Sequence, residues 1–245
     1  MTTAIDKPAG ERPGRLGRAL IQLIMRRARV VSCEPVADRF RLVTLQGAAL
    51  AGAAWAPGRK IQVAMGSAFV ARTYTPMDWD AVDGRTRILG YAHGEGPGSA
   101  WLRALRPGDE CAVFGPRASL TIAPAAPLVV CGDETSMGLA HALAAHGRAS
   151  SLACVFEVGD LGAARAAAAR LELPEAALFE RAADDAHVEA MAVRLASLAE
   201  TGATFVLTGR AGAIQALRRS LLRRAVAPGR ILAKAYWAPG KAGLD

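Results

Sequence analysis

The stretch 71–79, which reads ARTYTPMDW, combines residue types that suit an extended anionic ligand. Side chains of a strand alternate between two faces, so Arg72 and Tyr74 share one face while Thr73 and Thr75 share the other. A guanidinium, a flat ring and short hydroxyl donors would then follow one another along a single strand. Such a strand could bind a phosphate and an aromatic group together.

An ordinary strand explains the same residues. Thr and Tyr favour strands, and Pro76 would end the pairing before a polar turn at 78–83. The choice between a binding strand and an ordinary one depends on the rest of the chain.

A second stretch, 93–101 (HGEGPGSAW), could hold an anion. Its three glycines let backbone amides approach a ligand closely, and Ser99 lies where a helix would begin, with its positive end toward a phosphate. The glycines are Gly94, Gly96 and Gly98, and Pro97 lies among them. The structural alternative is a glycine-rich turn in which His93 is a loop residue and Trp101 a core aromatic.

A third candidate follows the apolar run that starts at Leu128. The run ends in Asp133, Glu134 and Thr135, at the strand-end position where open α/β sheets bind ligands, and Thr135 could cap the next helix. A similar turn at 208–210 offers Arg210 to a nucleotide phosphate. Any α/β domain needs turns of this kind, so these residues alone do not establish a nucleotide site.

The elements that would position these residues fall into two groups. Short β-type runs occupy 29–34, 39–46, 60–65, 69–76, 86–92 and 110–114, with one helical insert near 99–105. This pattern predicts a six-stranded antiparallel barrel. Apolar strands then alternate with helices at 136–146, 161–170 and 213–224, and a last strand is expected at 230–236. That alternation predicts a Rossmann-like α/β domain with a parallel sheet.

The predicted organisation has three parts. We expect a tail with a short helix (16–27) over residues 1–28, the barrel over 29–122 and the α/β domain over 123–245. The length of 245 residues suits two modest domains, and a hydrophobic content of 52% with a mean hydropathy of +0.20 excludes a disordered chain.

The sequence also indicates where the protein is located and what it binds. No apolar run reaches the roughly 18 residues of a membrane helix, and arginines follow the run 19–25 where a signal peptide would be cleaved. We therefore expect a cytoplasmic monomer without membrane insertion. The four cysteines are widely spaced, so we expect reduced structural thiols and no metal site.

The net charge of +8 raises the question of nucleic acid. The arginines, however, are scattered over Ala-rich helices, and the cluster at 218–224 has helical spacing without interleaved aromatics for base stacking. A solvated helix face explains it better, and no nucleic-acid partner is expected. A basic surface would also attract small anionic ligands.

In its order of domains the chain resembles the ferredoxin-reductase-like flavoproteins, and within them the siderophore-interacting proteins, which are FAD-dependent ferric-siderophore reductases. Four segments carry the resemblance, which extends from about Arg29 to Gly240. They are Arg72-Thr73-Tyr74-Thr75, the segment 93–101, Gly132-Asp133-Glu134-Thr135, and Tyr236-Trp237 with Gly240. Each is weak alone, but their order and spacing are specific.

The resemblance implies roles for these residues. Arg72 would neutralise the FAD pyrophosphate, Tyr74 would pack along the isoalloxazine or ribityl chain, and Thr75 would hydrogen-bond near flavin N5. The segment from His93 to Trp101 would complete the FAD site, with Trp101 near the adenine or merely anchoring its helix. Asp133, Glu134, Thr135, Tyr236 and Trp237 complete the expected cofactor set.

Two departures from the family pattern leave the electron donor open. Relatives commonly carry a second arginine where this chain has Met77, and often a proline where it has Gly138. In addition, no basic cluster follows the strand 152–158 to select a 2′-phosphate, and Asp160 there would disfavour NADPH. NADPH, NADH and a reduced ferredoxin therefore all stay open as donors.

The expected activity is transfer of electrons from the donor through FAD to iron(III) in a siderophore, with release of iron(II) for iron acquisition. No catalytic side chain and no protein-bound metal are needed. Candidate contacts to the anionic chelate are Lys60, Arg117, Lys234 and Lys241, each of which could equally be an ordinary surface charge. The alternatives are a flavin reductase that serves an oxygenase or a biosynthetic enzyme, and a non-catalytic flavin-binding protein.

Overall fold

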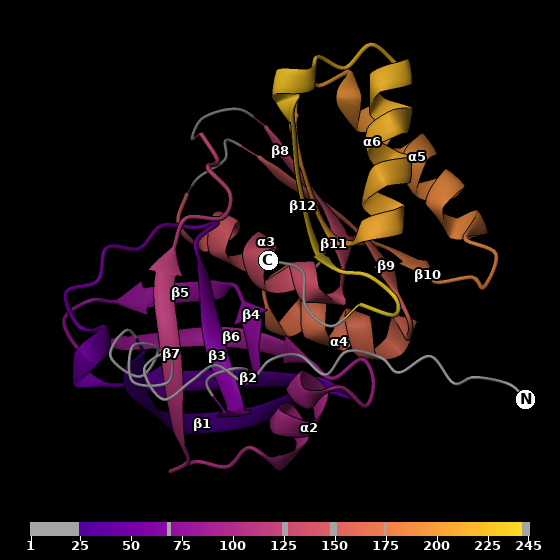
Figure 1. Cartoon of the computed structure of the whole chain (residues 1–245). Helices are drawn as coiled ribbons and strands as arrows, with labels where there is room; N and C mark the ends of the chain where they lie inside the picture. Colours follow the sequence, from indigo (N-terminus) through magenta and orange to yellow (C-terminus); the bar gives the residue numbers. More distant parts are fainter. Residues whose placement is uncertain (1–24, 68–69, 124–126, 148–150, 174, 242–245) are drawn as a thin grey trace, which may run out of the picture.

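The fold is described from a computed structural model, which covers residues 25–67, 70–123, 127–147, 151–173 and 175–241. An antiparallel sheet forms the first half of the chain and a parallel sheet covered by helices forms the second (Figure 1). The predicted fold class is confirmed. The division at 122/123 stays a prediction; the first sheet ends at Arg117 and the second begins at Leu128.

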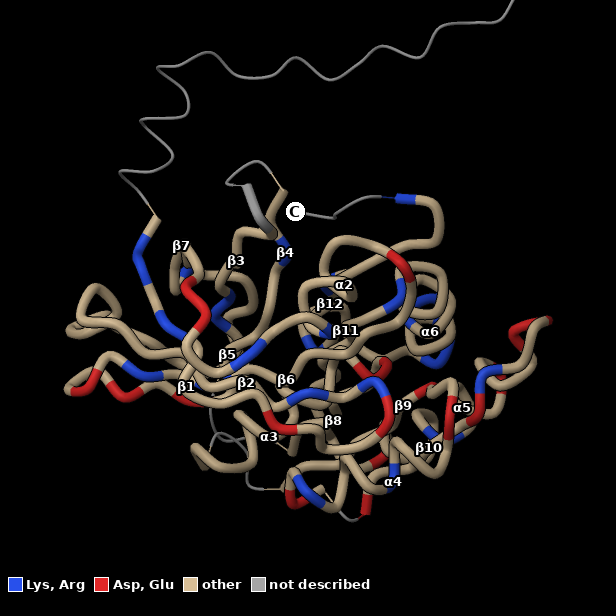
Figure 2. The backbone as a smooth tube through the Cα atoms, turned by 90° about the horizontal axis from the view of Figure 1, so that it is seen from below, with Lys and Arg blue, Asp and Glu red and all other residues tan. Residues whose placement is uncertain are grey.

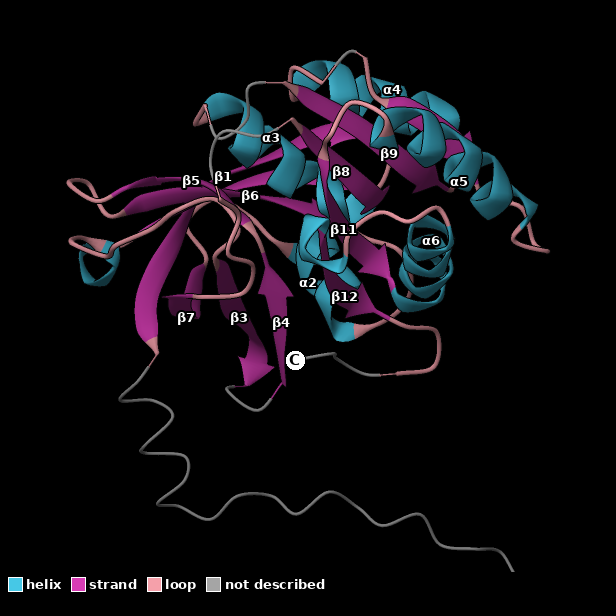
Figure 3. Cartoon of the chain, turned by 90° about the horizontal axis from the view of Figure 1, so that it is seen from above, coloured by secondary structure: helices cyan, strands magenta, loops and turns pink. Residues whose placement is uncertain are grey.

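The first sheet has seven strands in the order β4-β3-β7-β1-β2-β6-β5. Their bounds are β1 (Arg26–Ala37), β2 (Phe40–Gln46), β3 (Lys60–Ser67), β4 (Val70–Tyr74), β5 (Pro76–Asp80), β6 (Arg85–Tyr91) and β7 (Glu110–Arg117). A short 3-10 turn, η1 (Ala48–Leu50), follows β2, and the helix α2 (Pro97–Ala104) follows β6. The sheet is strongly curled, because β7, β3 and β4 run across the direction of β5, β1 and β6 (Figure 3).

Three expectations for this half need correction. Residues 78–80 belong to a seventh strand, β5, and not to a turn; Asp78 reads as a turn residue but pairs with Arg87 of β6 at 2.5 Å. Pro76 therefore opens a strand, and only Thr75 separates β4 from β5. The helix predicted over 16–27 lies mostly outside the described residues, and Arg26 and Arg27 lie in β1.

The second sheet is entirely parallel, in the order β10-β9-β8-β11-β12. Its strands are β8 (Leu128–Asp133), β9 (Leu152–Val158), β10 (Ala177–Glu180), β11 (Thr204–Arg210) and β12 (Ile231–Trp237). The helices are α3 (Met137–Ala145), α4 (Leu161–Arg170), α5 (Ala186–Ala199) and α6 (Ala211–Arg223), with 3-10 turns η2 (Glu134–Ser136) and η3 (Pro228–Arg230). The sequence had not predicted β10 and α5.

The two halves pack through one continuous apolar cluster. Leu139 and Leu143 of α3 belong to the same buried cluster as Phe40, Met77 and Leu89 of the first sheet. Helices α3 and α4 lie on the face of the parallel sheet that meets the first half, and α5 and α6 cover the other face (Figure 1). This contact fixes the strand ends of both sheets near one another. Among the described helices, none is long and apolar enough to span a bilayer.

Candidate functional site

A cavity of about 450 Å³ opens where the two halves meet, which is a volume typical of small-molecule sites. The first half contributes β4 and the start of α2, and the second half contributes η2 and the end of β12. Of the predicted site residues, those lining the cavity are Lys60, Arg72, Thr73, Tyr74, Thr75, His93, Gly96, Pro97, Gly98, Ser99, Thr135, Lys234, Tyr236, Trp237 and Lys241.

The cavity wall formed by β4 and α2 has the features of an anion site. The Arg72 guanidinium donates to the Ala71 carbonyl at 2.8 Å and has further donors left over. A Cβ at Gly98 would lie 3.1 Å from Arg72 Cγ, whereas one at Gly96 would meet nothing within 4 Å. Helix α2 begins with Pro97 at its first position and no side chain caps its amides. Free amides beside a guanidinium fit the pyrophosphate of a dinucleotide.

Tyr74 supplies the flat surface beside this anion site. It is largely buried, and burial raises the pKa of its hydroxyl, so the ring stays neutral at physiological pH. Trp101 lies behind it, with ring centroids 5.8 Å apart, and does not line the cavity. This packing on Tyr74 fits the second of the two roles that the resemblance left open, and the role stays a prediction. Gly94 also lies outside this cavity, in a neighbouring hollow with Arg39 and Arg103.

A row of hydroxyls crosses from β4 into the parallel sheet. Thr75 Oγ1 lies 3.4 Å from the Tyr236 hydroxyl, which also bonds to Thr208. Thr208 Oγ1 in turn donates to Ser136 Oγ at 2.8 Å. Burial raises the pKa of Tyr236 to about 12, so it acts as a neutral hydroxyl. These hydrogen bonds hold β12 beside the cavity, and the Thr75 hydroxyl lies at the cavity edge.

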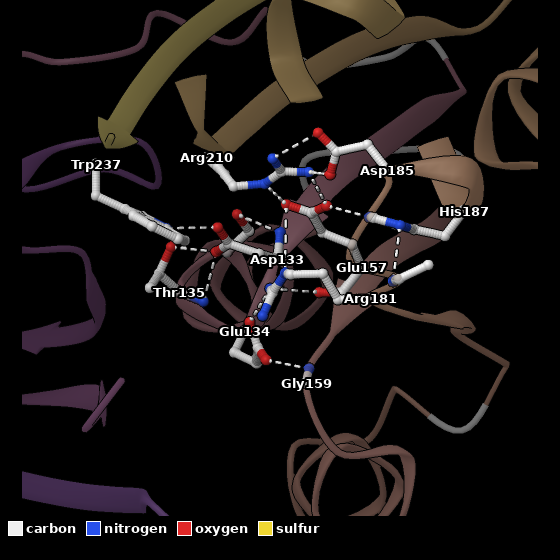
Figure 4. A network of polar contacts seen from close by, with 12 residues as sticks. Asp133, Glu134, Thr135, Glu157, Gly159, Arg181, Asp185, His187, Arg210 and Trp237 are labelled. Atoms are coloured by element: carbon white, nitrogen blue, oxygen red, sulfur yellow. Dashed lines mark hydrogen bonds and ion pairs between the residues drawn. The ribbon is translucent and has the colours of Figure 1, made fainter. Parts of the chain in front are cut away.

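Asp133 lies directly behind the cavity wall and is fully buried. Its Oδ1 accepts from the Thr135 amide at 2.8 Å and from the Thr135 hydroxyl, and its Oδ2 accepts from Trp237 Nε1 at 2.7 Å (Figure 4). Burial raises the pKa of this carboxyl to about 6, although the bonds from Thr135 and Trp237 oppose the shift. Trp237, held in this way, stacks on His93 with centroids 5.1 Å apart.

The remaining acidic groups of this sheet edge form an ion-pair network (Figure 4). Arg210 donates twice to Glu157, at 2.8 Å each, and also to Asp185, at 2.7 and 3.1 Å. Arg181 binds Glu134 at 2.8 Å, and His187 contacts Glu157 at 2.6 Å. Arg210 was expected to meet a nucleotide phosphate, but its donors are engaged with carboxylates.

Three lysines add positive charge to the cavity lining. They are Lys60, Lys234 and Lys241, the last of them exposed. Arg117, the fourth predicted substrate contact, is directed elsewhere: it donates to Gln62 Oε1 at 2.8 Å and lies over the Phe114 ring at 4.4 Å. Glu134 is likewise buried behind the wall, bonded to the Gly159 amide at 2.7 Å. Across the described ranges, no group of His, Cys, Asp and Glu could hold a metal ion.

Sequence reasoning missed several lining residues, among them Leu89, Tyr91 and Ser119. Tyr91 is the last residue of β6, a strand that reads as core, and its ring contacts Phe40 at 4.7 Å and His93 at 6.3 Å between centroids. The two departures from the family pattern meet in space, because Met77 Cγ lies 3.5 Å from the position of a Cβ on Gly138. Met77 is a core residue, 1% exposed, so an arginine there could not reach a ligand in this arrangement.

Comparison with solved structures shows the same two-domain arrangement. A siderophore utilization protein from T. fusca superposes with a TM-score of 0.71 and 25% identity over 90% of this chain and 95% of its own. The siderophore-interacting protein SipS from Aeromonas hydrophila gives a TM-score of 0.71 and 23% identity over 89% of this chain and 92% of its own. The ferredoxin reductase of carbazole 1,9a-dioxygenase gives 0.69 and 16% over 87% of this chain and 69% of its own.

The sequence comparisons narrow the class. Residues 62–120 match the family model described as the siderophore-interacting FAD-binding domain. No curated protein sequence matches the chain significantly.

Fold and cavity together define a two-domain reductase of the ferredoxin-reductase-like class, built for flavin-dependent electron transfer. Within that class, residues 62–120 match the siderophore-interacting FAD-binding domain, and the chain shares its fold with a siderophore utilization protein.

Proposed function

We propose that this protein is an FAD-dependent reductase that passes electrons from an external donor to iron(III) held in a siderophore and so releases iron(II). The observation that carries the proposal is a cavity lined from both halves, with Arg72 and Tyr74 on the wall from the first half and three lysines, Lys60, Lys234 and Lys241, in the same lining. The match to a siderophore-interacting FAD-binding domain over residues 62–120 supports the same conclusion.

The residues of the first half fit FAD. In the proposal, Arg72 and the uncapped amides at the start of α2 bind the pyrophosphate, and Tyr74 provides a surface for the ring or ribityl chain. Thr75 offers a hydroxyl at the point where β4 ends. Bound FAD supplies the redox chemistry, because it accepts electron pairs and releases single electrons. Thr73, His93 and Ser99 complete the proposed cofactor contacts.

The lysines of the cavity lining fit an anionic chelate. Lys60, Lys234 and Lys241 would attract it electrostatically and hold it at the cavity edge. Iron(III) is a hard ion that prefers anionic oxygen ligands, and the same ligands hold iron(II) less tightly, so reduction loosens the metal. Iron is a substrate in this proposal, and the protein needs no nucleophile or metal ligand of its own.

The donor in the proposal is NADH, NADPH or a reduced ferredoxin. The edge of the parallel sheet favours NADH over NADPH, because Asp160 caps α4 directly after β9 and both arginines of the edge, Arg181 and Arg210, are paired with carboxylates. A 2′-phosphate would meet acidic groups there. Anaerobic titration with each of the three donors, followed in the flavin absorption band, distinguishes them.

The test of the proposal uses the purified full-length protein. We expect visible flavin absorption, or its appearance after incubation with FAD together with a rise in melting temperature. The reduced protein is then mixed anaerobically with a ferric siderophore in a stopped-flow instrument. Rapid flavin reoxidation with capture of iron(II) by a chromogenic chelator is expected, and reoxidation no faster than in chelate-free buffer would refute the substrate assignment.

The same experiment separates the alternatives. A partner of an oxygenase would be reoxidised by a ferredoxin or by free flavin but not by the ferric chelate. A non-catalytic binding protein would bind FAD and be reduced by none of the three donors.

A further inference from the structure

The hydrogen bonds around Asp133 determine which way the Thr135 hydroxyl points. Three donors surround the carboxyl: the Thr135 amide and hydroxyl at Oδ1, and Trp237 Nε1 at Oδ2. An amide N–H and an indole N–H can only donate, whereas a hydroxyl can donate or accept. The Thr135 hydroxyl is therefore the one partner of the three that can accept a proton from Asp133.

We propose that Asp133 and Thr135 form a proton relay that exchanges one proton with the ligand in the cavity. With Asp133 ionised, the Thr135 hydroxyl donates inward to Oδ1 and presents its lone pairs to the cavity. With Asp133 protonated, Oδ1–H donates to Thr135 Oγ1, and the hydroxyl's own proton turns toward the cavity. Thr135 thus changes from an acceptor to a donor at the wall that it lines. The relay rests on the proposed function, because it takes the cavity ligand to be FAD.

The proton balance of the relay is simple. The carboxylic proton of Asp133 passes to Thr135 Oγ1, the former hydroxyl proton of Thr135 passes to a basic atom of the ligand, and Asp133 is left ionised. The step moves no electron; the external donor of the proposed function supplies those. Where Asp133 is protonated beforehand, the ligand therefore gains its proton without any uptake from solvent.

The surroundings of Asp133 suit a group that changes its charge. Burial raises the pKa of the carboxyl to about 6, within reach of physiological pH. Glu134, next in the chain, adds negative charge, and Glu157 is the register partner of Asp133 on β9. Arg181 beyond Glu134 is the nearby cation, and Tyr236 on β12 is neutral. Neither arginine of the network bonds to Asp133; both bond to glutamates.

Gly209 of β11 shows that the carboxyl is closely confined. Its φ is +101°, and a Cβ there would lie 2.5 Å from Oδ2. The carboxyl thus occupies the space that a side chain at Gly209 would need and is fully buried, so a proton that it loses leaves through one of its hydrogen-bond partners. Thr135 is the partner that reaches the cavity as a hydroxyl.

The test measures the midpoint potential of bound FAD from about pH 5 to pH 8, on both sides of the carboxyl's pKa. A proton that a two-electron reduction takes from solvent adds about 30 mV per pH unit to the slope of potential against pH. Below its pKa Asp133 supplies that proton itself, so we expect a slope smaller by about this amount below the pKa than above it in the natural protein and in Thr135→Ser, which keeps the hydroxyl. We expect no such change of slope in Asp133→Asn and in Thr135→Val.

The variants distinguish the relay from a structural role. Thr135→Val leaves Asp133 in place and removes only the hydroxyl, so it decides the question even if Asp133→Asn does not fold. A slope that is the same on both sides of the pKa in all four proteins would overturn the proposal. So would a change of slope that survives in Thr135→Val, since Asp133 would then act without Thr135.

The measurement is independent of the proposed substrate. It requires neither a ferric siderophore nor a particular donor, so a protein that shows the change of slope but leaves the chelate unreduced refutes only the substrate assignment. A protein that takes up no FAD refutes the relay and the proposed function together.

Discussion

The ion-pair network at the edge of the parallel sheet makes a prediction about stability. Glu157 is 1% exposed and accepts three hydrogen bonds, two from Arg210 at 2.8 Å and one from His187 at 2.6 Å. Glu157→Gln removes the negative charge and places a side-chain NH2 group, itself a donor, against the donors of Arg210 and His187. Breaking one partner of a buried ion pair costs about 3–5 kcal/mol. Asp185 still pairs with Arg210, so we expect the low end, a loss of about 3 kcal/mol.

The matched control is Asp185→Asn on the same arginine. Asp185 is 54% exposed, and exposed pairs contribute about 0.2–1 kcal/mol. Its φ of +60° is one that asparagine also adopts readily, so the backbone is not strained by the change. Urea unfolding at neutral pH, with the m-value unchanged, gives both differences from the shifts in midpoint. A loss for Glu157→Gln below about 1 kcal/mol, or equal to that of Asp185→Asn, would refute the reasoning.

The same variant has a defined pH dependence. Burial alone would raise the pKa of Glu157, but hydrogen bonds from Arg210 and His187 hold it below its ordinary value. A carboxyl with a lowered folded-state pKa contributes stability that is fully present above its unfolded pKa of about 4.3 and is lost as the pH falls through the folded value. The difference between the natural protein and Glu157→Gln should therefore be constant at neutral pH and shrink below about pH 4.

Three further predictions concern the cavity. Arg72→Ala should weaken FAD binding by about 1.5–3 kcal/mol, the contribution of a hydrogen bond to a charged group, as measured by flavin fluorescence titration; Arg72→Lys should recover part of it. Gly209→Ala should lower the melting temperature, because its φ of +101° is strained for alanine and the new Cβ would lie 2.5 Å from the Asp133 carboxyl. Replacing Lys234 and Lys241 together by glutamine should slow reduction of an anionic ferric chelate and flatten its salt dependence, while a neutral chelate is affected little.

Local patterns predicted the parts of the fold that have strong periodicity. The helix expected over 161–170 matches α4, because an alanine-rich run between Asp160 as N-cap and Leu171 leaves little choice. The strand β10 and the helix α5 were not predicted, each for its own reason. β10 has only four residues and is paired along one edge, while α5 begins after Asp185 in a left-handed conformation instead of at an ordinary cap.

The site was predictable only where one segment carries it. Residues 72–75 and 96–99 lie on the cavity as their local sequence suggested, because each segment lies in or beside one element. The directions of Arg117, Glu134 and Arg210 depend on partners that are distant in sequence: Gln62, Arg181 and Glu157. No local pattern states which of several charged residues will pair with another. Long-range ion pairs thus decided which charges face the cavity.

The way these charges pair also distinguishes Asp133 from the other buried carboxyls. Three carboxylates, Asp133, Glu134 and Glu157, lie side by side at one sheet edge, each 2% exposed or less. The two glutamates each bond to an arginine. Asp133 receives only neutral donors, and burial together with the neighbouring Glu134 raises its pKa. A proton that enters or leaves this buried edge near neutral pH should therefore do so at Asp133, the carboxyl whose hydroxyl partner lines the cavity.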